Sequence, residues 1–460
     1  MFVIKNYEKL IENGLTQKDR DARHVALNCI LSALDAVNPK KAVFNNVKRR
    51  ENLLVIGRYK FDLTEYRNIY VLGGGKASGL MAEAIEEILG DKITSGIINV
   101  LKGTEKMVKT KKIKINGATH PIPGEEGVNS TKAMLEIARK AGKDDLIIAL
   151  ISGGGSALMP CPADPVTLED KKTVTNLLLK CGATINEINV VRKHLSAFKG
   201  GQLAKTAYPA TLVNLIISDV VGDPLDIIAS GPTVPDSSTF QDAYNVLKKY
   251  NLLNKIPENI KKRIQLGLSG KIEETPKPGD KIFRNVHNIL IASNRTACIA
   301  AVKKARELGI NSMLLSTYIE GEARHVGAVL AGLAKEIHNY DTPIKKPAVI
   351  VCGGETTVTV VGNGKGGRNQ ELALGSALKI SGLNGIVIAS VGTDGKDGTS
   401  DAAGAIVDGQ TLKRAQKLGL DATKYLADNN SYMFFKKLGD AIFTGTTGTN
   451  VNDLIIIVVL

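Results

Sequence analysis

Two glycine-rich segments, residues 73–76 and 152–156, have the composition of anion-binding turns. Each follows an apolar run and precedes a stretch with helical periodicity. Glycines allow consecutive backbone N–H groups to point at one anion, the N-terminal end of the next helix strengthens the attraction, and Lys76 would add a full charge. A tight turn without a ligand is the alternative for either segment alone, but their recurrence favours an anionic ligand. We predict that phosphate is bound by Gly74, Gly75, Ser152, Gly153, Gly154, Gly155 and Ser156.

A basic segment, NVVRKHLSAFKGGQ, follows at residues 189–202. Its positive charges precede a Gly-Gly break, so they could converge on a carboxylate or a phosphate. A solvated basic helix face is the simpler alternative. We expect Arg192 and Lys199 to bind substrate, whereas His194 is as compatible with helix packing as with proton transfer.

Two carboxylates, Asp219 and Asp223, come shortly after another apolar run. Ligands bind beyond the C-terminal ends of strands in open parallel sheets, so both side chains would lie at the mouth of the sheet. There they could hold Mg²⁺, which proteins bind through few carboxylates and several waters. They could equally cap the next helix.

Three polar segments in the second half of the chain could also do chemistry. Residues 352–357 end an apolar run with Glu355 and two threonines, and residues 362–371 contain Arg368 and Asn369 in a glycine-rich setting. The third segment, GTDGKDGTSD, begins at Gly392. Each alone could be a polar turn, but together they favour a binding site, and the planar fork of arginine suits phosphate or carboxylate.

Several familiar motifs are absent from the sequence. No stretch fits the Walker A pattern, and the dinucleotide pattern GxGxxG that would start at Gly73 fails because Ser78 occupies its last position. The hydrolase pattern GxSxG fails at Leu158, so Ser156 is expected to be a hydrogen-bond donor and not a nucleophile. A calcium-binding loop is excluded at Lys396.

The composition is that of a globular protein with a basic surface. The formal charge is +14, but aromatic residues make up only 4% and there is no tryptophan, so we expect anionic metabolites and not nucleic acid as partners. The five cysteines are an odd number and none has CxxC spacing, which favours a reducing, cytoplasmic environment over disulfides or a zinc site. We expect no signal peptide and no membrane span.

Apolar runs that alternate with amphipathic stretches position these segments. Such runs begin at residues 69, 146, 212, 286, 348 and 386. They predict an α/β protein with parallel strands covered on both faces. Residues 251–284 are polar and contain Pro and Gly, so we place a peripheral helix and the linker there. The predicted domains are residues 1–285 and 286–460.

The assembled motifs resemble the glycerate 2-kinase family whose C-terminal half is a MOFRL-type domain. In the first half they are GGGKASG, ATHPIP, SGGGSALM, RKHLSAFKGGQLA and SDVVGDPLDIIASGPTVPD. In the second half they are GGETTVTVVGNGKGGRNQELAL, GTDGKDGTSDAAGA and TGTTGTNVNDL. A local departure is Thr446-Thr447, where a proline is expected in the last motif.

The resemblance implies a Rossmann-like N-terminal domain, a smaller α/β C-terminal domain, and an active site in the cleft between them. It also implies ATP- and Mg²⁺-dependent phosphorylation of D-glycerate at its 2-hydroxyl, with Lys76 and Arg368 as the leading catalytic candidates. Lys76 would contact the transferring phosphate, and Arg368 would bind phosphate or the glycerate carboxylate. We expect Glu355 and Asn369 to bind substrate, and Asp394 to be a candidate proton acceptor.

Two other classes of function compete with a kinase. The first is an oxidoreductase acting on hydroxypyruvate, which the failed dinucleotide pattern disfavours. The second is a metabolite sensor, which would need an output module that the sequence does not show. The sequence is compatible with a monomer or a homodimer.

Overall fold

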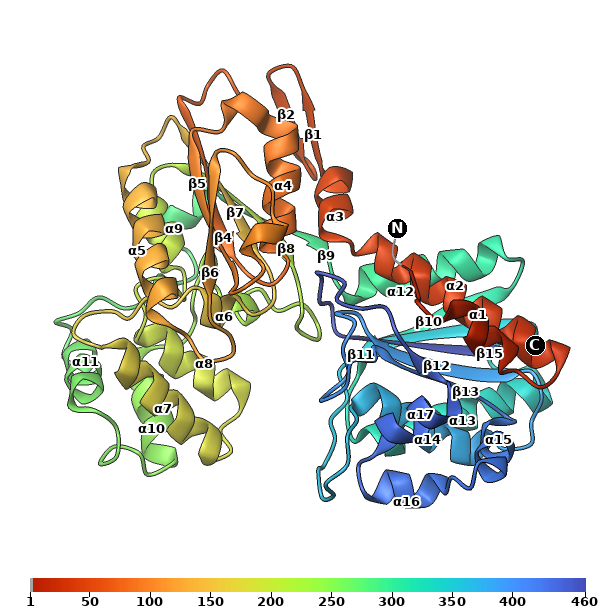
Figure 1. Ribbon diagram of the computed structural model, residues 1–460. Helices are drawn as coiled ribbons and strands as arrows, with labels where there is room; N and C mark the ends of the chain where they lie inside the picture. The colour runs from red at the N-terminus through yellow and green to blue at the C-terminus, as the bar shows by residue number, and fades with distance from the viewer. Residues whose placement is uncertain (1–2) are drawn as a thin grey trace. The chain divides into compact units, whose positions relative to one another are not determined.

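The computed structural model describes residues 3–460, which form two compact units (Figure 1). One comprises residues 42–291, and the other combines the described residues up to 41 with residues 292–460. We call the first the central unit and the second the terminal unit, and describe each by itself. No helix within residues 3–460 has the length and apolar character needed to cross a membrane.

A six-stranded sheet forms the middle of the central unit. Its strand order is β6-β5-β4-β7-β8-β9, and every pairing from β6 to β8 is parallel. Helices α4 and α5 lie on opposite faces of this sheet (Figure 1). This double cover explains why the strands read as continuous apolar runs. The strands are β4 (Asn68–Gly74), β5 (Ser95–Leu101), β6 (Ile113–Ala118), β7 (Asp145–Ile151), β8 (Thr211–Ile217) and β9 (Val286–Ala292).

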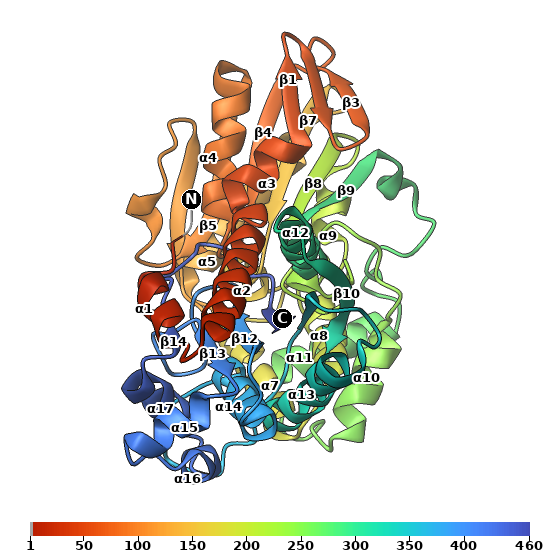
Figure 2. The same ribbon diagram turned by 90° about the vertical axis from the view of Figure 1, so that its right-hand side faces the viewer.

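The helices of the central unit include a separate group, α7, α8, α10 and α11, at one end of the unit (Figure 2). This group packs around its own apolar cluster. Helices α7, α8 and α10 each begin with a threonine capping box, which satisfies backbone N–H groups of their first turns. The helices are α3 (Pro39–Asn46), α4 (Ser78–Leu89), α5 (Glu125–Lys140), α6 (Gly155–Leu158), α7 (Leu168–Lys180), α8 (Ile185–His194), α9 (Gln202–Ala207), α10 (Phe240–Lys249) and α11 (Glu258–Leu268).

Shorter elements complete the central unit, and α3 also crosses its boundary at residue 41. A small antiparallel sheet consists of β1 (Val47–Arg50), β2 (Leu53–Ile56) and β3 (Tyr59–Asp62). The 3₁₀ helices are η1 (Gly90–Lys92), η2 (Glu105–Met107), η3 (Ile228–Ser230) and η4 (Lys281–Asn285).

The terminal unit contains a second six-stranded sheet of order β10-β11-β15-β12-β13-β14. Only β10 and β11 pair in parallel, and the other pairings are antiparallel. Figure 1 shows α2 and α12 on one face of this sheet and α13 and α14 on the other. The strands are β10 (Asn311–Ile319), β11 (Ala348–Gly354), β12 (Ile386–Gly392), β13 (Gly404–Asp408), β14 (Ala441–Ile442) and β15 (Asp453–Val459).

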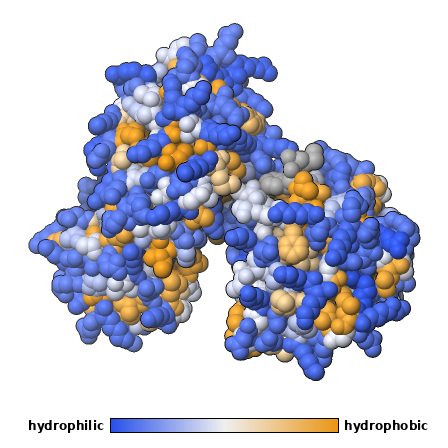
Figure 3. All heavy atoms as spheres, viewed as in Figure 1, coloured by the Kyte–Doolittle hydropathy of each residue, from blue (hydrophilic) through white to orange (hydrophobic). Residues whose placement is uncertain are grey.

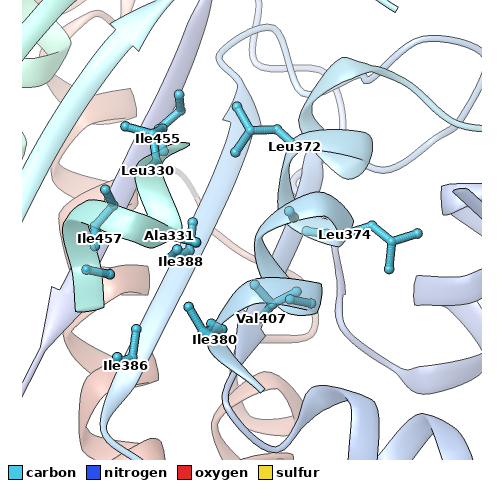
Figure 4. Packing of buried hydrophobic residues seen from close by; sticks show 14 of the residues in the cluster. Leu330, Ala331, Leu372, Leu374, Ile380, Ile386, Ile388, Val407, Ile455 and Ile457 are labelled. Atoms are coloured by element: carbon cyan, nitrogen blue, oxygen red, sulfur yellow. The ribbon is translucent and has the colours of Figure 1, made fainter. Parts of the chain in front are cut away.

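The core of the terminal unit lies between its sheet and α13 and α14 (Figure 4). Leu330 from α13 and Leu372 from α14 pack near Ile388, Ile455 and Ile457 of the sheet. The helices are α1 (Tyr7–Glu12), α2 (Gln17–Ala36), α12 (Asn294–Glu307), α13 (Ala323–Tyr340), α14 (Arg368–Ile380), α15 (Thr411–Lys417), α16 (Ala422–Ala427) and α17 (Ser431–Leu438).

The structure confirms the α/β class but differs from the sequence prediction in two respects. The second sheet is mixed and not parallel, because the C-terminal strand β15 inserts antiparallel between β11 and β12. The strand that begins at Val286 belongs to the first sheet, as β9, and therefore does not start a second unit.

The division of the chain also differs from the predicted domains 1–285 and 286–460. The observed boundary lies at residue 291, and the described residues up to 41 belong to the terminal unit. The reason is physical: the buried guanidinium of Arg23 in α2 pairs with Asp408 at 2.6 Å and with Asp440 at 2.9 Å. Polar residues cover most of the molecular face seen in Figure 3, in keeping with the composition.

Candidate active site

The two glycine-rich segments meet at the C-terminal ends of the adjacent parallel strands β4 and β7. The backbone N–H of Lys76 donates to the carbonyl oxygen of Gly153 at 2.8 Å. The N–H of Ala77 donates to the Ser152 hydroxyl at 3.0 Å, and that hydroxyl lies 2.9 Å from the hydroxyl of Ser78. The structure therefore brings together the predicted phosphate-binding residues of both turns.

Two of these glycines cannot be replaced without a clash. Gly75 has φ +153°, and a Cβ atom there would lie 2.1 Å from the Ser152 hydroxyl oxygen. A Cβ atom on Gly153 would lie 2.2 Å from a carboxylate oxygen of Asp219. The Asp219 side chain thus packs directly on the backbone of the second turn.

The charged groups around Gly154 come from three different strand ends. A Cβ atom placed on Gly154 would lie 3.4 Å from Cε of Lys76 and 3.3 Å from Nε2 of His120. Burial lowers the pKa of His120, and the charge of Lys76 lowers it further. Burial raises the pKa of the Asp219 carboxyl, while Lys76 acts in the opposite direction. The result is a lysine flanked by a neutral imidazole and a carboxyl group.

The predicted metal ligands differ in how well their positions suit Mg²⁺. Asp219 lies beside the glycine turn, where a metal that also contacts phosphates would need a carboxylate. Asp223 has φ +56° and its backbone N–H donates to Val220 in a turn. No group of three or more His, Cys, Asp or Glu side chains suited to a metal occurs among the described residues. Asp219 fits the role of a ligand that shares the ion with bound phosphates.

A cavity of about 630 Å³ opens beside the second glycine turn. The predicted substrate-binding residues Arg192 and Lys199 both line it, together with Gly154 and Ser156. The ammonium of Lys199 donates to the carbonyl oxygen of Ser156 at 2.8 Å. Burial lowers the pKa of Lys199 well below its ordinary value, and the charges of Lys171 and Arg192 add to this effect. The predicted basic segment is therefore buried, and it is not a solvated helix face.

His194 has a structural role in the central unit. Its imidazole is buried, with Nδ1 2.8 Å from the carbonyl oxygen of Val190 and Nε2 3.1 Å from a Glu274 carboxylate oxygen. The ring also packs against Phe240. Helix packing is thus the interpretation that its surroundings support.

Arg368 in the terminal unit is the first residue of α14 and pairs with two carboxylates. Its Nε and Nη2 donate to the two oxygens of Asp453, at 2.5 and 3.0 Å, and its Nη1 lies 3.0 Å from Glu355. Burial acts to lower the pKa of Arg368, but Asp453 and Glu355 hold it above its ordinary value. The guanidinium is therefore fixed in one orientation at the end of the helix.

Asp397 supports the beginning of the same helix. Its carboxylate accepts hydrogen bonds from the backbone N–H groups of Asn369, at 3.0 Å, and Gln370, at 2.9 Å. The Asn369 amide donates to Asp453 at 3.0 Å and accepts from Ser390 at 2.6 Å. Burial raises the pKa of Asp397 to about 6, although the two backbone donors favour its charged form. Asn369 is fully hydrogen-bonded within the protein, so its contacts are those of a positioning residue.

A second cavity, of about 610 Å³, lies at this end of the terminal unit. Glu355 and Arg368 line it, but Asp394 does not. One Asp394 carboxylate oxygen accepts from the Lys396 backbone N–H at 3.0 Å, which closes the turn after β12. Burial raises the pKa of Asp453, and the negative charge of Asp394 acts in the same direction. Of the four site residues predicted in the second half of the chain, Glu355 and Arg368 therefore line this cavity, and Asn369 and Asp394 do not.

Comparison with known proteins matches two parts of the chain to two families, and the first match begins at residue 25, within α2 of the terminal unit. Residues 25–265 match the family described as Domain of unknown function (DUF4147), and residues 348–453 match the MOFRL family. A glycerate 2-kinase from Pyrococcus horikoshii is 45% identical over 95% of this chain and 98% of its own length.

The chain belongs to the glycerate 2-kinase family.

Two further proteins extend the comparison within this family. The crystal structure of a glycerate kinase from Thermotoga maritima is 40% identical, covers 95% of this chain and 99% of that chain, and has a TM-score of 0.84. A relative from Agrobacterium vitis, 40% identical over 96% of this chain and 97% of its own length, carries a provisional hydroxypyruvate reductase name. The family resemblance inferred from the motifs is thus confirmed.

Several functional candidates of this glycerate 2-kinase family member escaped the residue-by-residue prediction. His120, Asp397 and Asp453 lie inside motifs that carry the family resemblance, so their presence in a motif was the available signal. Lys171 also lines the first cavity. It lies on a helix outside every motif, and a lysine on an amphipathic helix ordinarily predicts a solvated position.

Proposed function

We propose that this protein is a kinase that transfers the γ-phosphoryl group of ATP to the 2-hydroxyl of D-glycerate and yields 2-phosphoglycerate. Family membership supports a kinase that uses a nucleotide and a glycerate substrate. The observation that carries the proposal is the position of Lys76 against the glycine turn formed by β4 and β7. A lysine beside a glycine turn at the C-terminal ends of parallel strands is an arrangement suited to phosphoryl transfer.

Charge neutralisation is the main task of the proposed site, because the transferring phosphoryl group passes through a loose transition state. Lys76 would contact the oxygens of that group, and the glycine turn would bind the neighbouring phosphates through its backbone. Asp219 would hold Mg²⁺, which supplies further positive charge to the phosphates when bound. His120 lies beside the same turn and could form one hydrogen bond to a phosphate oxygen.

Arg368 is the proposed cation of the terminal unit, with Glu355 and Asp453 as the groups that orient it. Arg368→Lys should lower kcat/KM for glycerate by about tenfold, because a lysine keeps the charge but loses a charge-assisted hydrogen bond. Steady-state kinetics with varied glycerate would measure this. Arg306→Lys, at an exposed position, is the matched control, and an unchanged kcat/KM in Arg368→Lys would remove the arginine from the mechanism.

A double-variant experiment tests the prediction that Lys76 and Arg368 serve one reaction. Effects on kcat/KM of residues that act as one unit are strongly non-additive, whereas independent sites add. The double variant Lys76→Ala/Arg368→Lys should therefore lose less than the product of the two single effects. A fully multiplicative loss would argue for separate roles.

The product decides between the proposed activity and its alternatives. Incubation with D-glycerate, ATP and Mg²⁺, followed by phosphorus and proton NMR, should show 2-phosphoglycerate and no 3-phosphoglycerate. A parallel reaction with hydroxypyruvate and NADH tests the reductase that the provisional name of the Agrobacterium relative suggests. Oxidation of NADH without an ATP-dependent product would overturn the kinase proposal.

We also propose a cytoplasmic location. The five cysteines are all free thiols, as is usual in a reducing compartment. Cell fractionation would test this proposal. A homodimer is compatible with the sequence, and light scattering would measure the oligomeric state.

A further inference from the structure

Four basic side chains of the central unit line the cavity beside the second glycine turn. One of them, Lys172, pairs with Glu169, which also lines the cavity, and the other three are Lys171, Arg192 and Lys199. Lys171 projects from α7, Arg192 from α8, and Lys199 from the segment that follows α8. Lys171 is 7% exposed and Lys199 is 2% exposed. Buried cations normally have a carboxylate partner, so the partners of these three are informative.

Lys171 has no hydrogen-bond partner for its ammonium within residues 3–460. Lys199, by contrast, donates to the Ser156 carbonyl oxygen. The two acidic residues nearest in sequence on α7 have other partners. Asp170 accepts from the Thr167 backbone N–H and the Asn259 amide, and the largely exposed Glu169 lies 3.3 Å from Lys172. The ammonium of Lys171 is therefore buried without an anion from the protein.

The groups that act electrostatically on Lys171 are nearly all positive or neutral. Arg192 and Arg263 oppose its charge, and Lys171 in turn disfavours the charge of Lys199. The remaining group is the Cys161 thiol, whose own pKa is raised by burial, so it is neutral at pH 7. His120, which also lines the cavity, has a pKa lowered by burial and by the charge of Lys76, and it adds no compensating negative charge.

This arrangement is costly unless a ligand completes it. Burial lowers the pKa of Lys171 to about 8, and the two arginines contribute in the same direction. An uncompensated buried charge destabilises the folded state, and an incoming anion removes that penalty. The cavity walls combine the three cations with apolar surface from Ile122, Leu168 and others. Such walls would favour binding of a small organic anion, which has both a charge and an apolar part.

We propose that Lys171, together with Arg192 and Lys199, binds the carboxylate of the hydroxy acid that accepts the phosphoryl group. This inference rests on the proposed kinase function. The phosphates of the nucleotide have a separate set of partners in the glycine turn and Lys76, so the three cations are available to the other substrate. Lys199 links the two sets, because it also contacts the turn through Ser156.

The proposal makes glycerate binding depend on pH. Below about pH 8 Lys171 is charged, and above it the ammonium loses its proton and with it the attraction for a carboxylate. KM for glycerate should therefore rise by about tenfold between pH 7 and pH 9, as expected for a required cation with a pKa near 8. KM for ATP should change much less.

Lys171→Met tests the site, because methionine keeps most of the side-chain volume and removes the charge. KM for D-glycerate at pH 7 should rise by about tenfold or more, with KM for ATP unchanged, and the rise of KM toward pH 9 should shrink. The unliganded variant should melt at a higher temperature than the wild type, because a buried unpaired charge is gone. Addition of D-glycerate should stabilise it less than it stabilises the wild type.

Lys180→Met is the matched control, since Lys180 is an exposed lysine on the same helix and does not line the cavity. It should change neither KM. An unchanged KM for glycerate in Lys171→Met would overturn the inference, and a raised KM for ATP alone would assign the three cations to the nucleotide phosphates instead. Failure of the wild type to phosphorylate glycerate would be a failure of the proposed function, and the melting measurements with glycerate alone would still test the binding site.

Discussion

Lys76→Ala should lower kcat for glycerate phosphorylation by at least about a hundredfold, because it removes a preorganised charge from the transferring phosphoryl group. The backbone N–H of residue 76, which donates to Gly153, is retained in alanine, so the glycine turn should persist. The loss should therefore appear in the chemical step. Single-turnover experiments with saturating ATP and glycerate would measure that step directly.

The interpretation of Lys76→Ala needs a control for loss of surface charge. Lys102→Ala is suitable, because Lys102 is exposed and pairs only with Glu126 on the surface of the same unit, an interaction of small energetic value. Its kcat should stay within about twofold of the wild type. Equal turnover in Lys76→Ala and the wild type would exclude Lys76 from transition-state stabilisation and leave the glycine turn as the main phosphate contact.

The central sheet and its glycine turns were predictable because their signals are local. The inner strands β7 and β8 are buried almost throughout, so they appear as largely apolar runs such as residues 146–151. Parallel strands place their C-terminal ends at one edge, and adjacent strands β4 and β7 bring Gly75 and Ser152 together as a consequence. The sequence therefore predicted where these turns lie in the sheet.

The remaining features depend on contacts between distant residues, which periodicity does not encode. An apolar run such as residues 454–460 reads as a strand, but nothing in it specifies an antiparallel position in the middle of a sheet. Lys171 reads as a solvated helix residue, whereas the folded central unit buries it. Asn369 was predicted to bind substrate because polar residues cluster there. In the structure its side-chain amide instead forms hydrogen bonds with Asp453 and Ser390.

The attachment of the N-terminal segment to the terminal unit gives the second large prediction. Arg23 is completely buried, and besides Asp408 and Asp440 it donates to the Leu10 carbonyl oxygen at 2.8 Å. Arg414 also pairs with Asp440. Burial acts to raise the pKa of Asp440, but Arg23 and Arg414 hold it below its ordinary value, so the charged form of Asp440 depends on these two cations.

Arg23→Ala should lower the free energy of unfolding of the terminal unit by about 3–5 kcal/mol, because it leaves buried carboxylates without a partner. Denaturant unfolding would measure the change, and Arg20→Ala, at an exposed position one turn earlier, should change stability by no more than about 0.5 kcal/mol. Adding Asp408→Asn to Arg23→Ala should recover part of the loss, since one unpaired charge is then removed. A destabilisation no larger than that of Arg20→Ala would contradict the role assigned to Arg23.

The segments in which Arg23→Ala increases hydrogen exchange show whether Arg23 stabilises the terminal unit alone or the whole protein. Helix α2 packs against β12 and β15, and β15 begins with Asp453, the residue that orients Arg368. Hydrogen exchange in Arg23→Ala should therefore increase in β13 and β15, while β4 and β7 in the central unit keep their protection. If α2 does transmit its support to Asp453, then kcat/KM should fall in Arg23→Ala even at temperatures where the protein remains folded. Normal kinetics together with faster exchange would instead limit Arg23 to stability, because Arg368 would then keep its orientation without support from the N-terminal segment.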